Sequence, residues 1–173
     1  RSRAAEAVLK EVEAGAVYAS HAYLPQGTAG FATIAYELWE QIGAEPGCIL
    51  LPVGHGSLLL GIYLGFQALL ARGAISRMPR LVGIQAAACA PLWQAVQEGL
   101  DKPHPTQGGR TLAEGVAIAD PYHGKAVLQA VKESGGFFVR IGEEEIAAGH
   151  KQLARRGFYV EPTSALVWGG LDQ

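Results

Sequence analysis

Short apolar runs alternate along this chain with longer segments whose apolar residues recur at helical spacing. A short apolar run bounded by glycine or proline is typical of a strand in a parallel sheet, whereas a 3.6-residue period is typical of a helix. Strands are predicted over residues 16–23, 48–53, 80–85 and 136–141. Helices are predicted over residues 2–14, 33–42, 58–71, 90–97, 124–134, 143–156 and 161–170. This alternation favours the α/β class, with a mostly parallel twisted sheet flanked by helices.

The chain has the size and apolar content of one domain. It is 173 residues long and 49% hydrophobic, which is enough to build a core. Residues 100–110 are rich in proline, glycine and charge, and they predict a long surface loop. We find no internal repeat and no linker that would divide two domains, so residues 1–173 are expected to form a single α/β segment.

Charge and cysteine usage narrow the class of function. The net charge is −2 and the basic residues are scattered, so we expect neither a nucleic-acid partner nor binding to an anionic membrane. Cys48 falls in a predicted core strand and Cys89 in an alanine-rich turn. Neither has a metal-like spacing, and the histidines share none, so no metal site is predicted. Two buried thiols indicate a reducing compartment and hence a cytoplasmic location.

The two ends of the sequence suggest a piece of something larger. The chain begins at Arg1, and it ends just after a predicted apolar helix. We therefore expect these residues to be the C-terminal part of a longer polypeptide. Ordinary terminal processing or removal of a tag is the alternative.

The most informative stretch joins the strand over 48–53 to the helix over 58–71. It reads Gly-His-Gly-Ser at residues 54–57. A strand, a glycine-rich turn and a helix start together make an anion cradle, because backbone N–H groups and the helix dipole face the ligand there. The stretch predicts a bound phosphate group. The alternative is a tight turn in which the glycines serve packing only.

A dinucleotide site is the obvious competing interpretation of a Gly-x-Gly turn. Such a site needs an acidic residue about 20 residues beyond the glycines, at the end of the next strand. Here that strand ends in Gln85, followed by three alanines, and the glycine spacing differs from Gly-x-Gly-x-x-Gly. A nicotinamide-dependent dehydrogenase is therefore disfavoured.

Four segments, in order, resemble a known family. They are residues 30–37 (GFATIAYE), 51–58 (LPVGHGSL), 80–85 (RLVGIQ) with 111–117 (TLAEGVA), and 157–165 (GFYVEPTSA). Together they are similar to the C-terminal half of fold-type II pyridoxal-phosphate enzymes, the group of threonine synthase, threonine dehydratase and tryptophan synthase β. The Glu-Pro-x-Ser-Ala motif, with the acids over 143–145, favours the threonine-synthase-like branch. The resemblance implies a fold like part of the large domain of tryptophan synthase β.

The resemblance also implies a cofactor and its contacts. Pyridoxal 5'-phosphate would bind through its phosphate, which would accept hydrogen bonds from the backbone N–H groups of the loop and from the Ser57 hydroxyl. For His55 we favour a solvent-facing loop histidine over a phosphate contact. Glu161 matches a carboxylate near the coenzyme pocket, with a structural acid at a helix start as the alternative. The implied cofactor-binding residues are Gly54, His55, Gly56, Ser57, Leu58 and Glu161.

Two parts of the family's active site are missing from this sequence. The lysine that forms the Schiff base lies in the family's N-terminal half, as does the loop that grips the substrate carboxylate, and neither motif occurs here. We therefore assign no catalytic residue and expect the isolated chain to be inactive. The expected partners are the enzyme's N-terminal half, an amino-acid substrate and, as the family is commonly dimeric, a second copy.

The resemblance implies that the whole enzyme is of the lyase type and acts on amino acids by elimination or replacement. The alternative function is a non-catalytic α/β module that binds a phosphorylated small molecule or a partner chain through the same cradle.

Overall fold

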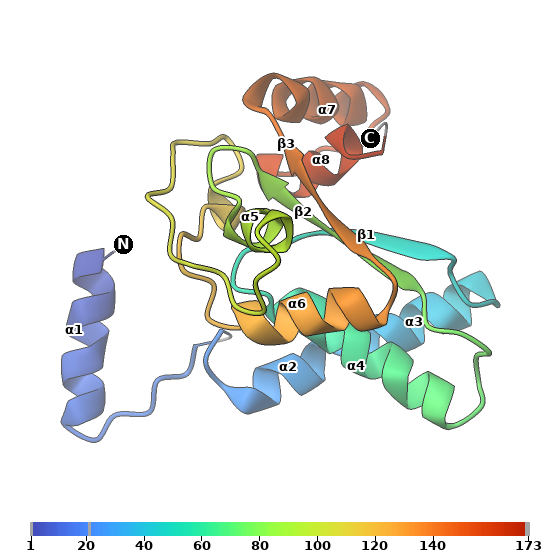
Figure 1. The fold of residues 1–173 in the computed structure, drawn as a ribbon, viewed down its shortest axis with the longest axis horizontal. Coiled ribbons are helices and arrows are strands. Elements are labelled where there is room, and N and C mark those ends of the chain that lie inside the picture. Colours follow the sequence, from blue (N-terminus) through green and yellow to red (C-terminus); the bar gives the residue numbers. More distant parts are fainter. Residues whose placement is uncertain (1, 21, 172–173) are drawn as a thin grey trace.

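A computed structural model describes residues 2–20 and 22–171 as helices packed around a small sheet (Figure 1). The strands are β1 (Cys48–Pro52), β2 (Arg80–Ala86) and β3 (Phe137–Ile141). The helices are α1 (Ser2–Glu13), α2 (Pro25–Phe31), α3 (Thr33–Ile42), α4 (Ser57–Ala71), α5 (Pro91–Gln97), α6 (Gly124–Glu133), α7 (Glu143–Arg155) and α8 (Pro162–Gly169). A short 3₁₀ turn, η1, covers Glu114–Val116.

The strands form one parallel sheet in the order β1-β2-β3. Leu50 of β1 is opposite Val82 of β2, and Ile84 of β2 is opposite Val139 of β3. Each parallel pair is joined by a helical connection, as parallel pairing requires. The predicted α/β class with a parallel sheet is confirmed.

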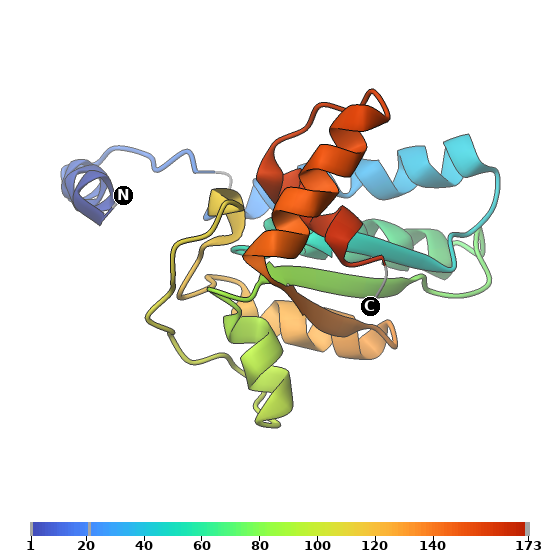
Figure 2. The ribbon, with the colours of Figure 1, turned by 90° about the horizontal axis from the view of Figure 1, so that it is seen from above.

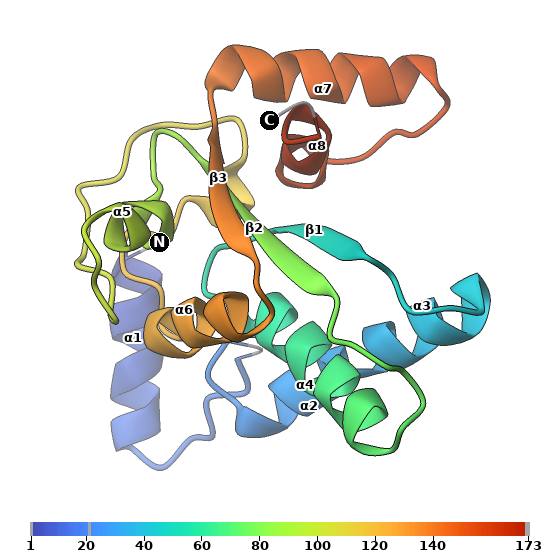
Figure 3. The same ribbon diagram turned by 45° about the vertical axis from the view of Figure 1, so that its right-hand side comes forward.

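Helices cover both faces of the sheet (Figures 1 and 3). On one face α4 and α6 pack against the sheet, and on the other lie α7 and α8. Alternate residues of β2 point to the two faces, as the period of a strand requires, so Leu81 joins one core cluster and Val82 the other. The carboxyl ends of all three strands therefore meet at one edge, where the connecting loops gather.

The prediction for residues 16–31 is wrong in two places. Residues 16–20 form no strand and residues 22–23 form a turn, while His21 lies outside the described residues. The amides here bond within their own segment, as Ser20 N–H does to the Tyr18 carbonyl at 2.8 Å. No helix is predicted over residues 25–31, where the structure has α2, which begins with Pro25 at a position where proline is tolerated.

Packing explains why α2 forms despite its two glycines and a proline. It lies against α4, in which Gly61 leaves room for Phe31. A Cβ atom at Gly61 would lie 2.2 Å from the Cβ atom of Phe31, so only glycine permits this close approach.

The prediction that residues 48–53 form a core strand needs correction. β1 ends at Pro52 and is an edge strand in the described sheet, and four of its five residues are only half-buried. Cys48 is among them, whereas Cys89 is buried as expected. The other predicted helices and strands are present, with ends within one or two residues of their predicted positions.

Helix α1 stands apart from the layered body (Figures 1 and 2). In the part of the chain that the structure describes, no helix is both long and apolar enough to cross a membrane. Within the same ranges, no group of three or more His, Cys, Asp or Glu residues is arranged to hold a metal ion.

Candidate functional site

The glycine loop, residues 54–58, connects the end of β1 to the first turn of α4. Gly56 is the N-cap of the helix, with φ +98° and ψ −3°. The first intrahelical bond runs from Leu60 N–H to the Gly56 carbonyl at 3.0 Å. The N–H groups of residues 57–59, in the first turn of α4, have no acceptor within the helix, and the positive end of the helix dipole is located there. The predicted helix start is thus in place for an anion.

Ser57 is the first residue of α4, and its side chain is only 5% exposed. Its Oγ atom is buried and has no hydrogen-bond partner among the described residues. An orphaned buried hydroxyl costs about 1–3 kcal/mol of free energy, so its presence calls for a partner supplied from outside the chain.

Packing also explains the two glycines of the loop. A Cβ atom at Gly56 would lie 2.2 Å from Cγ2 of Val127 in α6, and one at Gly54 would lie 3.0 Å from the Gly115 carbonyl oxygen. The glycine loop therefore packs closely against α6 and against residues 115–118. The glycines thus serve packing, as the alternative interpretation of the turn supposed. This packing does not use the N–H groups of the first turn or the Ser57 hydroxyl, so both can still contact a ligand.

His55 is half-buried, and the backbone of residues 122–123 forms hydrogen bonds to it. Its carbonyl oxygen accepts a hydrogen bond from His123 N–H at 3.1 Å, and its Nδ1 accepts one from Tyr122 N–H at 3.4 Å. The Tyr23 ring lies 6.0 Å away, and Tyr23 and Tyr122 meet edge to face at 4.6 Å. These contacts fix the peptide that carries His55 within the loop. A contact of its backbone N–H group with phosphate stays a prediction, as does the solvent-facing role that we favour for its side chain.

The remaining two predicted residues have different surroundings. Leu58 is half-buried and packs on the core cluster beneath α4, so its contribution to a ligand would be its N–H group alone. Glu161 is exposed and is the N-cap of α8, where its carbonyl accepts bonds from Ser164 and Ala165 at 3.0 Å each. Its carboxylate makes no capping bond. The backbone of Glu161 thus serves the helix start, and a role for its side chain stays a prediction.

One contact that sequence reasoning missed joins two of the resembling segments. Gly115 N–H donates to Oγ1 of Thr163 at 3.1 Å, and Thr163 is buried in the first turn of α8. Since Gly115 also touches the glycine loop at Gly54, this bond connects the loop to the Glu161 region. The two residues are far apart in sequence, and no local pattern signals their pairing.

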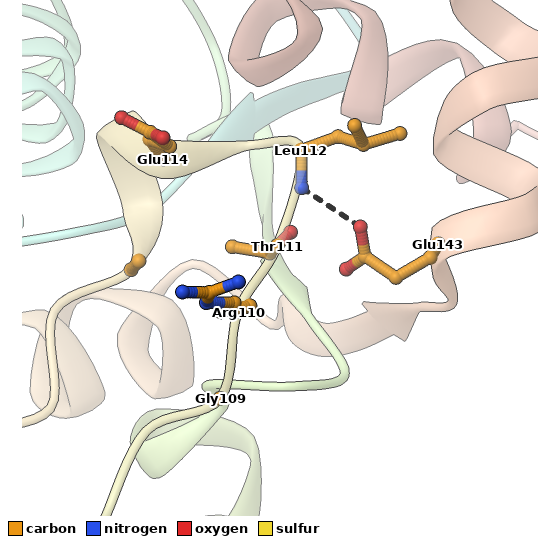
Figure 4. Close-up of a pocket in the computed structure, with 7 residues that line it drawn as sticks. Gly109, Arg110, Thr111, Leu112, Glu114 and Glu143 are labelled. Atoms are coloured by element: carbon orange, nitrogen blue, oxygen red, sulfur yellow. Dashed lines mark hydrogen bonds between the residues drawn. The ribbon is translucent and has the colours of Figure 1, made fainter.

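A pocket of about 650 Å³ is lined by residues on either side of Gly115 in the sequence (Figure 4). Glu143, at the start of α7, accepts a hydrogen bond from Leu112 N–H at 2.8 Å. The residues predicted from the sequence to bind the cofactor do not line it. Its lining consists of Gly109, Arg110, Thr111, Leu112, Glu114, Ala117 and Glu143.

The buried cysteine is unsuited to act as a nucleophile. Burial raises the pKa of the Cys89 thiol. The thiol therefore stays protonated near neutral pH, and the reactive thiolate is not formed.

Residues 1–173 match the sequence model of a family described as pyridoxal-phosphate dependent enzyme. The chain belongs to this family. A threonine synthase from Methanosarcina acetivorans is 34% identical over 157 residues, which are 90% of this chain and 39% of that protein. The threonine synthase of Methanocaldococcus jannaschii is 31% identical over 159 residues, again spanning 39% of its own length. These matches confirm the resemblance to the threonine-synthase-like branch, over a chain much shorter than its relatives.

Two solved structures share the fold of this chain. The processed form of threonine deaminase isoform 2 from Solanum lycopersicum superposes with a TM-score of 0.69 at 22% identity, covering 85% of this chain and 38% of that one. A fungal L-serine ammonia-lyase from Rhizomucor miehei gives a TM-score of 0.70 at 18% identity, covering 84% and 44%. At these identities the structures show the fold alone.

The family implies pyridoxal phosphate as the cofactor, and the residues of the loop fit its phosphate group. The orphaned Ser57 hydroxyl can donate a hydrogen bond to a phosphate oxygen. The first-turn amides of α4 supply further donors, and the helix dipole favours the negative charge. Charge-assisted bonds of this kind are about twice as strong as neutral ones.

Proposed function

We propose that the glycine loop holds the phosphate of pyridoxal 5'-phosphate in a threonine-synthase-like enzyme that acts on amino acids by elimination or replacement. The observation that carries this proposal is the buried, unpartnered hydroxyl of Ser57 at the start of α4. A phosphate oxygen is the partner that this position favours, because the helix start already attracts an anion.

The residues of this chain bind and orient, while the bound coenzyme supplies an electron sink for the reacting substrate. The amides of residues 54–58 anchor one end of the coenzyme, and the η1 turn and the start of α8 form a wall beside it. Anchoring by the phosphate fixes where the reactive end lies, which is the positioning part of catalysis. Glu161, at the N-cap of α8, is the carboxylate that we propose near the pocket.

The lysine that bonds to the coenzyme is proposed to come from the enzyme's N-terminal half. The sequence has five lysines, and each is exposed on a helix or in the surface loop. Lys125, for example, pairs with Asp101 at 3.6 Å on the surface. A lysine that bonds to a coenzyme is typically desolvated in a pocket, whereas these five side chains are exposed to solvent. The chain on its own is therefore proposed to be inactive, and its amino-acid substrate and a second copy belong to the whole enzyme.

The test is an absorbance titration of the purified chain with pyridoxal phosphate, before and after borohydride reduction. We expect saturable binding without a lysine-linked product, whereas the full-length threonine synthase of Methanosarcina acetivorans, as the positive control, should yield one. Pyridoxal without its phosphate is the matched ligand and should bind much more weakly.

Two outcomes count against the proposal. A borohydride-fixed adduct on one of the five lysines would show a complete site in this chain. Absence of binding would favour the alternative function, a non-catalytic module that binds another phosphorylated small molecule or a partner chain.

A further inference from the structure

Gln85 is the residue at which a dinucleotide-binding enzyme would carry an acid, and the structure gives it a different task. It lies near the carboxyl end of the central strand β2 and is fully buried at 0% exposure. A buried amide must have its hydrogen bonds satisfied, and the partners of Gln85 show what it holds in place.

Its Nε2 group donates to the Val53 carbonyl oxygen at 3.2 Å. Its Oε1 atom accepts from the N–H groups of Leu92 and Trp93, each at 3.0 Å. These are the second and third residues of α5, whose N-cap residue Ala90 makes no side-chain cap of its own. The assignment of the amide is fixed by this network, because the reverse orientation would place NH₂ against two N–H donors.

The bond to Val53 acts directly on the glycine loop. The Val53 carbonyl and the Gly54 N–H belong to one peptide plane, and no cis peptide bond occurs in the described chain. In a trans peptide the two groups point in opposite directions, so the bond from Gln85 sets the direction of the Gly54 N–H. The Val53 N–H is itself held by the Ile84 carbonyl at 2.9 Å. Both peptide planes on either side of Val53 are thus fixed before the loop begins.

We infer that Gln85 is a positioning residue for the phosphate: it orients the first amide of the glycine loop and touches neither coenzyme nor substrate. The inference rests on the proposed function, in which that loop holds the coenzyme's phosphate. It also gives a physical reason for a glutamine at this position, since a carboxylate there would satisfy α5 but repel the Val53 carbonyl.

The decisive variant is Gln85→Glu, which keeps the size of the side chain and both bonds to α5. Once ionised, the introduced carboxylate has no proton to donate to Val53, so the peptide carrying the Gly54 N–H loses its anchor. Since burial raises the pKa of a carboxyl group, the variant is compared with the wild type at alkaline pH. The affinity for inorganic phosphate and for pyridoxal phosphate is expected to fall about three- to tenfold or more, while the affinity for pyridoxal stays unchanged. Gln85→Leu removes all three bonds and should show the same loss with lower stability.

A matched control is Ser134, the C-cap residue of α6, whose side chain contacts the opposite end of β2. Ser134 is also buried, and its Oγ accepts from Leu81 N–H at 3.2 Å and donates to the Val131 carbonyl at 2.9 Å. Ser134→Ala should lower the free energy of unfolding and leave phosphate affinity unchanged. This separates a positioning role of Gln85 from a merely structural one.

A second readout does not depend on the ligand. In the amide NMR spectrum of the unliganded chain, Gln85→Glu should shift the Gly54 resonance, and acid should restore it as the introduced carboxyl group protonates and becomes a donor. An unchanged Gly54 resonance together with unchanged phosphate affinity overturns the inference. If the wild-type chain binds no phosphate, the proposed function fails, and the Gly54 resonance still decides whether Gln85 sets this peptide.

Discussion

Gly115 N–H donates a hydrogen bond to Oγ1 of Thr163 over 3.1 Å, and this bond joins the η1 turn to the first turn of α8. Gly115 also touches the glycine loop, since a Cβ atom at Gly54 would lie 3.0 Å from its carbonyl oxygen. Three segments that are separate in sequence thereby meet at the carboxyl edge of the sheet. The wall of the proposed coenzyme site depends on this contact.

Thr163→Val keeps the shape of the side chain and removes the acceptor. We expect the free energy of unfolding to fall by about 1–3 kcal/mol, because the Gly115 N–H is left without its partner. Thr163→Ser, which keeps the hydroxyl, is the control and should cost less. Urea denaturation measures both, and equal stability of the two variants would contradict the role of the bond.

Gly56→Ala tests the geometry of the loop. Gly56 has φ +98°, and an added Cβ would lie 2.2 Å from Cγ2 of Val127. Strain of the left-handed backbone and overpacking together predict a loss of about 2–5 kcal/mol. Gly73→Ala is the matched control, with φ +70° and nothing within 4 Å of the added atom, and it should cost about 1–2 kcal/mol. Thermal unfolding of both variants would show a similar loss if the loop were free to move away from α6.

Ser57→Ala separates ligand binding from stability. Since the Ser57 hydroxyl is buried without a partner, its removal should leave the unliganded chain as stable as the wild type or more so. The affinity for pyridoxal phosphate should fall about tenfold, the loss of one charge-assisted bond. Calorimetric titration and unfolding curves measure the two effects. A variant that is less stable without ligand but binds as well as the wild type would contradict the assignment.

Much of the fold could be predicted because its signals are local. The strand that begins at Arg80 is an apolar run bounded by proline and alanine-rich turns, and the helix over Thr33–Ile42 has a clear stripe and ends at Gly43. The run over 16–23 is also largely apolar, yet it forms no strand, since a strand exists only when a neighbour pairs with it. Helix α2 was missed for the opposite reason, because packing against α4 overrides its low helix propensity.

The candidate site also has features that a local sequence pattern reveals and features that it does not. The glycine loop was found because its turn and helix start are contiguous in sequence. The bonds of Gln85 to Val53 and of Gly115 to Thr163 were not, since each joins residues that only the folded chain brings together. From the sequence, Gln85 was noted only because a dinucleotide site would need an acidic residue there. Its role as a buried hydrogen-bonding residue follows from its partners in the folded chain.

The hydrogen bond between Tyr63 of α4 and Glu133 of α6 predicts how stability depends on pH. The Tyr63 hydroxyl, followed by Gln129, lowers the pKa of Glu133 from 4.5, so this contribution is full above pH 4.5 and is lost as the pH falls through the lowered value. The same bond, with burial, raises the pKa of Tyr63 from 10.0 to about 12. Here the contribution is full below pH 10 and is lost as the pH rises through about 12.

Tyr63→Phe should therefore be less stable than the wild type between pH 4.5 and pH 10, with the difference shrinking outside that window. Because the pair is largely exposed, the difference should also shrink at high salt. Tyr36→Phe, at an exposed tyrosine of α3, is the control. Melting temperatures across the pH range check this, and a difference that is constant with pH would contradict it.

The most direct test of the central claim is an amide NMR titration of the chain with pyridoxal phosphate, repeated with pyridoxal. If the glycine loop holds the phosphate, the resonances of residues 54–58 should shift with pyridoxal phosphate and stay in place with pyridoxal. Shifts that are equal for the two ligands, or that appear around Arg110 and Glu143 in place of the loop, would contradict the account.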